Sequence, residues 1–146
     1  MRVVIAVGLI FGVFSLSFGQ SIAQNNIWQL LLKVGWTQKM SPQLGVEIDY
    51  PVFSSAVKAL NGKEIQITGY VLPMIYGQNY VALSAYPNAS CFFCGGAGIE
   101  SIVEVYPIRT RKYKPDEIVT FKGILKLNET DVEHLIYILE KAQELF

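Results

Sequence analysis

The residues of this chain whose types and spacing suit chemistry are concentrated in one short stretch, from Cys91 to Ser101. The stretch begins CFFCGGAG, holds both cysteines of the chain, and continues to Glu100 and Ser101. Glycine adopts positive φ without a steric penalty, so the glycines after Cys94 allow a sharp turn or a close approach of the backbone to a ligand.

Three interpretations of the Cys91/Cys94 pair remain open on the sequence. The two residues can be small buried or locally disulfide-paired cysteines in a tight connection between strands. They can supply two thiolates to a soft cation such as zinc. They can also form a thiol–disulfide redox pair, since this spacing can lower the pKa of a cysteine. Haem attachment is excluded, because Gly95 stands where a histidine would be needed.

The metal and redox interpretations are each incomplete. A structural zinc ion takes four protein ligands, and the expected set is Cys91, Cys94 and Glu100, with Glu104 as a fourth ligand or a second chain pooling its cysteines. The redox interpretation lacks a helix that begins at the motif, as in thioredoxin. A permanent disulfide between Cys91 and Cys94 would stabilise by only about 2 kcal/mol, because the closed loop is so short.

Outside this stretch the candidates are weaker. Arg109, Arg111, Lys112 and Lys114 form a basic cluster around Tyr113, which is expected to be a solvated loop. The formal net charge is 0, which provides no general attraction to nucleic acid. The aromatic residues Trp28, Trp36 and Tyr50 are expected in the core or lining a groove. A single histidine gives no credible Ser/His/Asp set, and the glycine run lacks the Lys and Ser or Thr of a phosphate loop.

The first residues have the pattern of a secretory signal peptide. Arg2 precedes an apolar run from Val3 to Phe18, and small residues at Ser17 and Gly19 suit a signal peptidase. We therefore expect a signal peptide over 1–19 and a mature domain over 20–146, in the periplasm or otherwise exported. The alternative is an uncleaved membrane anchor, for which the run is short. No later segment is long and apolar enough to span a membrane.

Three helices are expected to flank the sheet. Ile27, Leu30, Leu31 and Val34 have helical spacing. Ser54 is the expected N-cap of a short helix through Leu60, with Gly62 as its left-handed C-terminal residue. A closing helix is expected from Asn128 through Ala142, with Leu135 and Leu139 on its buried face and His134 in solvent.

Alternating residues predict strands over 63–73, 80–86, 101–108 and 117–127, with Gly69 and Gly123 marking bulges or tight coiling. Such bent strands covered by helices favour a mainly β (α+β) domain, a small, partly open OB-like barrel. An open sheet with helices on one face is the alternative.

The chain resembles a family of uncharacterised small exported bacterial proteins. The resemblance covers nearly the whole mature chain and is carried by PVF at 51–53, LNGKEI at 60–65, GYVLP at 69–73, SCFFCGGAG at 90–98 and GILKLN at 123–128. It implies export and an OB-like fold, and it implies no reaction. In related OB-like exported proteins the matching segment has a Cys and a nearby His, whereas this chain has Phe93 and Cys94 there.

The sequence thus predicts a non-enzymatic, exported binding module whose ligand contacts centre on the loop from Cys91 to Ser101. Its expected partner is a small ligand or an envelope protein and not nucleic acid, and no membrane span is expected after cleavage. The alternative function is a thiol–disulfide redox or metal-binding protein, with zinc as the candidate cofactor, that uses the Cys91/Cys94 pair.

Overall fold

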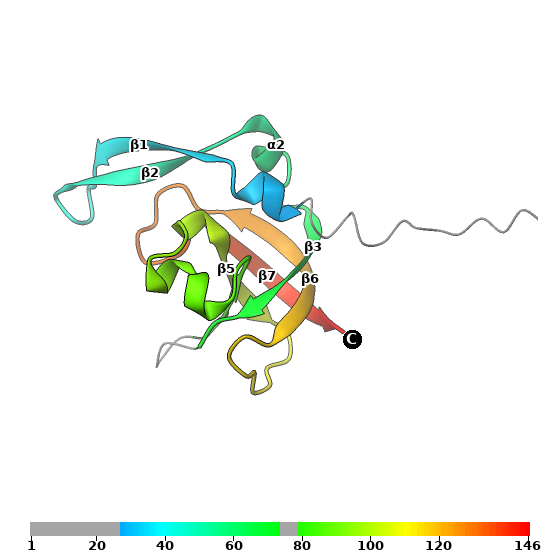
Figure 1. The fold of residues 1–146 in the computed structure, drawn as a ribbon. Helices are drawn as coiled ribbons and strands as arrows, with labels where there is room; N and C mark the ends of the chain where they lie inside the picture. Colours follow the sequence, from blue (N-terminus) through cyan, green and yellow to red (C-terminus); the bar gives the residue numbers. More distant parts are fainter. Residues whose placement is uncertain (1–26, 74–78) are drawn as a thin grey trace, which may run out of the picture.

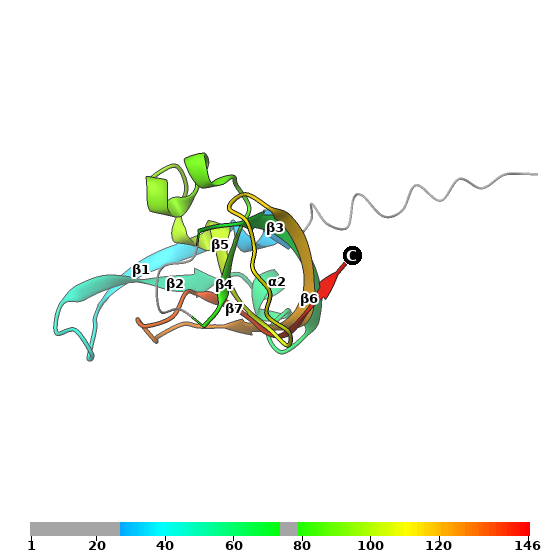
Figure 2. The same ribbon diagram turned by 90° about the horizontal axis from the view of Figure 1, so that it is seen from below.

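A β-hairpin extends from one end of a small β-barrel (Figure 1). The computed structural model describes residues 27–73 and 79–146. Residues 27–31 are helical and lead into β1 (Val34–Met40), which pairs antiparallel with β2 (Glu47–Phe53). Seen from a direction 90° away, the hairpin still extends away from the barrel (Figure 2). The short helix α2 (Ser55–Lys58) then connects the hairpin to the barrel.

The barrel is built from five strands and is closed within the described residues. They are β3 (Glu64–Val71), β4 (Val81–Ser84), β5 (Ile102–Pro107), β6 (Ile118–Leu127) and β7 (Tyr137–Leu145). The strand order is β3-β4-β5-β7-β6, with β6 returning to β3. All neighbouring pairs are antiparallel except β5 and β7. This is a mainly β, OB-like barrel, as predicted, although it is closed where a partly open one was expected.

Two glycines stand at special positions in the alternating strands of the barrel. In β3, Ile65 and Ile67 point inward and their neighbours outward. At Gly69 an added Cβ would lie 2.5 Å from the carbonyl oxygen of Ser84, so only glycine fits against β4. At Gly123 the register with β7 shifts, and Lys141 opposite has a φ of 51°. The predicted irregularity is thus confirmed at Gly123, whereas Gly69 keeps a regular register with Val119 and is needed for the close approach to β4.

One main core fills the barrel and extends under the helical residues at the N-terminal side. Its largest fully buried side chains include Phe121 from β6 and Tyr137 from β7. The Tyr137 hydroxyl donates to the carbonyl oxygen of Leu31 at 2.7 Å. Its ring centroid lies 5.5 Å from that of Phe53 at the end of β2. These contacts connect the N-terminal helical residues and the hairpin to the barrel.

The predicted closing helix is wrong. Residues 128–136 form a loop, and the residues beyond it form β7, which pairs with β5 and β6 and so closes the barrel. Helical spacing of apolar residues does not by itself distinguish a helix from a strand here. What makes this segment a strand is its hydrogen bonding to β5 and β6, which the local sequence does not show. The expected burial of Leu139 and exposure of His134 still hold, whereas Leu135, which was also expected to be buried, is only partly buried.

Other expectations have mixed outcomes. Ser54 caps α2 through a bond from the Val57 N–H at 3.3 Å, and Gly62 has a φ of 74°, both as predicted. The helix expected from Ile27 ends before Val34, which begins a strand. The expected signal peptide over 1–19 and most of the predicted turn over 76–79 lie outside the described residues.

Candidate functional site

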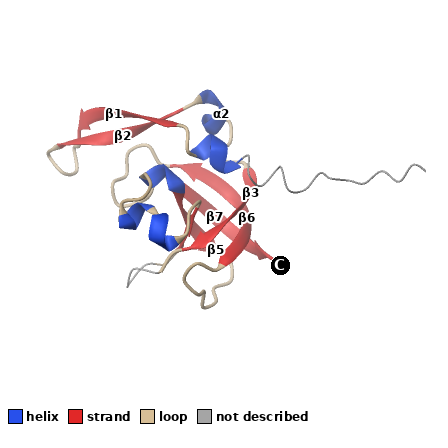
Figure 3. Cartoon of the chain, in the orientation of Figure 1, coloured by secondary structure: helices blue, strands red, loops and turns tan. Residues whose placement is uncertain are grey.

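The cysteine-bearing segment connects β4 to β5 as a chain of three single-turn helices: η1 (Asn88–Ser90), η2 (Phe92–Cys94) and η3 (Ile99–Ser101). They lie beside the barrel, separate from the other helical residues (Figure 3). Gly95 ends η2 with a φ of 74°, which glycine adopts freely. An added Cβ on Gly96 would lie 2.7 Å from the carbonyl oxygen of Ser90. The glycines therefore fix the shape of this segment, as the sequence predicted.

The two cysteines have different surroundings. Cys91 is fully buried in a small second core with Leu72, Ala82 and Ile102, and its Sγ lies 3.8 Å from Asn88 Oδ1. Cys94 is exposed. The pKa of the Cys94 thiol is raised, first by loss of solvation and then by its contact with Cys91. A raised pKa disfavours the thiolate, which is the reactive form in redox chemistry and the metal-binding form.

Both thiols are free in the described chain. The disulfide between Cys91 and Cys94, one of the alternatives that the sequence left open, stays a prediction. Within residues 27–73 and 79–146, no three His, Cys, Asp or Glu side chains are close enough together to hold a metal ion. The set of Cys91, Cys94 and Glu100 predicted as metal ligands is therefore not assembled in this structure.

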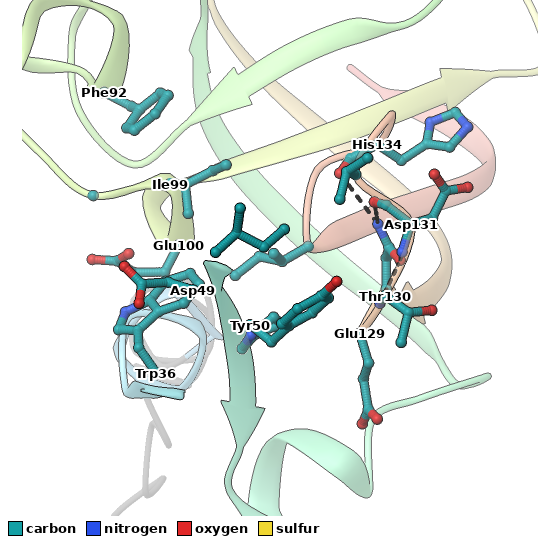
Figure 4. A pocket seen from close by; sticks show the side chains of 16 residues that line it. Trp36, Asp49, Tyr50, Phe92, Ile99, Glu100, Glu129, Thr130, Asp131 and His134 are labelled. Carbon is teal, nitrogen blue, oxygen red and sulfur yellow. Dashed lines mark hydrogen bonds between the residues drawn. The ribbon is translucent and has the colours of Figure 1, made fainter. Parts of the chain in front are cut away.

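A hollow of about 520 Å³ lies between three segments: the β1–β2 hairpin, the stretch from Phe92 to Glu100, and the 128–136 loop (Figure 4). Its apolar walls include Trp36, Tyr50, Phe92 and Ile99. The Trp36 side chain is 42% exposed, although it is one of the largest apolar side chains of the chain. The size lies within the range of about 300–1,000 Å³ that is typical of small-molecule sites.

Hydrogen bonds within the 128–136 loop, and one to the hairpin, stabilise its conformation. The Asn128 side chain accepts from the Asp131 N–H at 2.9 Å and donates to the Asp131 and Leu135 carbonyl oxygens. Asn128 was expected to be the N-cap of a helix, and its side chain does accept a hydrogen bond from the N–H three residues later, but within a loop. Val132 N–H also donates to Gln43 Oε1 of the hairpin turn, at 3.4 Å, so the loop contacts the hairpin.

A buried carboxylate anchors the end of this loop to the barrel. Glu104 on β5 is only 1% exposed. Its Oε1 accepts from the Leu135 N–H at 3.2 Å, and its Oε2 lies 3.1 Å from His134 Nδ1. The Tyr106 hydroxyl lies 3.5 Å from the same Oε2. Desolvation, followed by the Glu104 charge, raises the pKa of Tyr80 and Tyr106 nearby.

Only part of the predicted site lines the hollow. Phe92, Gly98, Ile99 and Glu100 contribute to its wall, whereas Cys91 and Cys94 do not. Glu104, expected as a metal ligand, anchors a loop instead. The acidic residues Asp49, Glu129 and Asp131 were not predicted as site residues. The turn residues from Ser41 to Gly45, which precede the alternating residues of β2, are the feature that could have indicated the hairpin.

Of the other sequence candidates, some make structural contacts and some line the hollow. Arg111 bonds to Glu117 and Glu144 and lies 4.1 Å from the centre of the Tyr113 ring, so it attaches its loop to the end of β7. No residue of the loop 108–117 lines the hollow. Trp28 is buried and donates to the Thr68 carbonyl oxygen at 2.7 Å, whereas Trp36 and Tyr50 line the hollow, so all three are core or groove residues as expected.

Comparison with models of known protein families found no match, and a search of curated proteins found none with significant similarity. No helix in the described part of the chain has both the length and the apolar character needed to cross a membrane.

Proposed function

We propose that this protein is a non-enzymatic binding module, and that its ligand occupies the hollow between the hairpin, the Phe92–Glu100 stretch and the 128–136 loop. The hollow itself is the observation that carries the proposal. It joins aromatic side chains from two separate segments, Trp36 and Tyr50 on the hairpin and Phe92 on η2, to a few polar groups. Small-molecule sites have this composition.

The side chains that line the hollow favour binding there over a second hollow nearby. The 128–136 loop forms a wall of both hollows, and the second is about 640 Å³. The lining of the second hollow includes Lys58 and Lys126 and contains no Trp, Tyr or Phe side chain. It also has no contribution from the glycine-shaped segment that the sequence singled out. The first hollow therefore supports the binding function better.

A ligand screen read by protein NMR tests the proposal. Small aromatic and aliphatic compounds are added to the isotope-labelled mature protein, and the shifts of backbone amides and of the two Trp side-chain N–H groups are followed. We expect the Trp36 N–H and the amides of Ile99 and Val132 to move together. The buried Trp28 N–H, bonded to Thr68, serves as the internal control. No shifts at the walls, or shifts confined to the second hollow, would contradict the proposal.

We also propose that the protein acts after export, with residues 1–19 removed as a signal peptide. The support is the positive residue Arg2, the apolar run and the small residues at Ser17 and Gly19. Sequencing the N-terminus of the protein recovered from the cell envelope tests this. A start near Gln20 is expected, and an intact Met1 in that fraction would refute export by cleavage.

A further inference from the structure

The hollow is acidic on more than one of its walls. Asp49 comes from β2, Glu100 from η3, and Glu129 and Asp131 from the 128–136 loop. In Figure 4, Asp49 and Glu100 lie on one side of the Tyr50 ring, and Glu129 and Asp131 lie on the other. Among the described residues no Lys or Arg lines the hollow. This is a local excess of negative charge in a chain whose formal net charge is 0.

The acidic residues of the hollow are not neutralised by ion pairs within the described chain. The ion pairs there use other carboxylates, namely Glu64, Glu117, Glu140 and Glu144, and also Glu104 when His134 is protonated. His134 also lines the hollow, but its Nδ1 contacts the buried Glu104. A concave surface with charge of one sign concentrates ligands of the opposite sign.

Aromatic faces in the same hollow add a second attraction for cations. Trp36, Tyr50 and Phe92 provide three rings, and Ile99 and Ile136 add aliphatic surface. Trp and Tyr faces attract a cation through their quadrupole, and the same rings bury an apolar group. An anionic ligand would gain the apolar contacts but would be repelled by the four carboxylates.

We propose that the ligand of this hollow is an organic cation, an ammonium, amidinium or guanidinium group joined to an apolar body. This inference rests on the proposed binding function and specifies the chemistry of its ligand. The charged group lies beside Asp49 and Glu100, and the apolar body lies against the aromatic rings. The Asp131 carboxylate, which accepts from the Glu133 N–H at 3.0 Å, adds negative charge from the other side of the Tyr50 ring. A free amine and the side chain of an arginine or lysine share this chemistry.

The absence of a side chain at Gly98 leaves room for the carboxylate of Glu100. A Cβ on Gly98 would overlap the carboxylate of Glu100. The backbone of Gly98 is extended, with a φ of −83°, so alanine is tolerated there without backbone strain. The flexible Glu100 side chain would have to move aside. Gly98→Ala therefore changes the position of a charge without removing it.

The test compares three probes of similar shape: benzamidine as the cation, benzamide as the neutral form and benzoate as the anion. Affinities come from NMR titration of the full mature protein, read at the Trp36 N–H and the Ile99 amide. We expect benzamidine to bind at least about tenfold more tightly than benzamide, and benzoate to bind most weakly. Added salt should weaken benzamidine binding more than benzamide binding.

Charge-neutralising variants show which carboxylates cause the preference for benzamidine. Glu100→Gln and Asp49→Asn should each weaken benzamidine binding by about threefold and leave benzamide binding unchanged. Gly98→Ala should also weaken benzamidine binding selectively. Glu47→Gln is the matched control, because Glu47 lies on β2 next to the hollow without lining it, and this variant should bind like the wild type.

A further arm separates the two sources of the cation. A blocked tripeptide with a central arginine that binds more tightly than benzamidine indicates a protein side chain, and the reverse order indicates a free small cation. Equal affinity for benzamidine, benzamide and benzoate at the hollow would overturn the charge inference and leave the binding function intact. Failure of every probe to shift the walls would overturn both. An equal effect of Glu47→Gln and Glu100→Gln would also overturn the inference.

Discussion

Glu104 is the residue whose substitution most sharply tests how the 128–136 loop is held. Its carboxylate is 1% exposed and accepts three contacts, from the Leu135 N–H, His134 Nδ1 and the Tyr106 hydroxyl. Glu104→Gln retains an oxygen for the Leu135 N–H but places an amide N–H₂ group where an acceptor is needed. Glu104→Ala also leaves that N–H without a partner.

The expected costs follow from the exposure of each partner. The His134 side chain is 41% exposed, so its contact with Glu104, which is an ion pair only when the imidazole is protonated, is screened by solvent and contributes about 0.2–1 kcal/mol. A buried hydrogen bond to a charged group contributes about 1.5–3 kcal/mol, and an unsatisfied buried N–H costs about 1–3 kcal/mol. We therefore expect losses in the free energy of unfolding of about 0.5 kcal/mol for His134→Ala, about 2 kcal/mol for Glu104→Gln and about 3 kcal/mol for Glu104→Ala.

Urea titration at neutral pH measures these differences, and hydrogen exchange at the Leu135 amide reports the local anchor. Glu140→Gln is the control, because Glu140 lies on the adjacent strand β7 and its side chain is 45% exposed, so a change within about 0.5 kcal/mol is expected. Stabilisation by Glu104→Gln would show that burial of the charge outweighs its contacts and would refute the reasoning. A cost for His134→Ala as large as that for Glu104→Ala would also refute it.

Three further predictions concern other parts of the molecule. Hydrogen bonds from Arg111 are the main cause of the lowered pKa of Glu144, so the stabilisation of the fold by this pair is present above the ordinary carboxyl pKa and is lost as pH falls through the lowered value. The loss of unfolding free energy caused by Arg111→Met, measured by urea titration, should therefore be smaller at pH 3 than at pH 7. A loss that does not change with pH would contradict this. Gly69→Ala should lower the free energy of unfolding by about 1–3 kcal/mol, because the added Cβ would lie 2.5 Å from a backbone oxygen. Gly35→Ala is the control and should not lower it, because the nearest atoms to its Cβ are 3.6 Å away. Equal losses in the two variants would refute the close-approach argument. In the thiol form, mass-mapped alkylation should label Cys94 and spare the buried cysteine until urea unfolds the protein, and equal labelling of both in the folded protein would contradict the burial described here.

The barrel strands could be predicted because their patterns are local. Alternation in β3 and β6 and the glycines at 69 and 123 contain enough information to locate bent, half-buried strands. The strand β7 could not be predicted in this way, because its pairing with β5 depends on residues more than 30 positions away. Its apolar residues fit a helical period equally well, and only barrel closure distinguishes the two.

The candidate site was predicted in part. The glycine-rich stretch after Cys94 indicated an unusual backbone, and its last residue, Gly98, lines the hollow together with Phe92, Ile99 and Glu100. The other two walls come from the hairpin and from the 128–136 loop, where Gly35 and Pro51 obscure the strands and helical spacing misassigned the loop. Asp49 and Asp131 are ordinary surface acids in the sequence, and only the fold brings them toward Glu100.

Blocking the hollow tests the central claim most directly. Val132 lines it from the loop and is 37% exposed, so Val132→Trp places a large ring at the hollow without disturbing the barrel core. The measurement is the NMR shift of the Trp36 N–H on addition of a compound that binds the wild type, with unchanged barrel amides as the check on folding. We predict that the shift disappears in Val132→Trp and persists in Glu47→Gln. An undiminished shift in a correctly folded Val132→Trp protein would contradict the account.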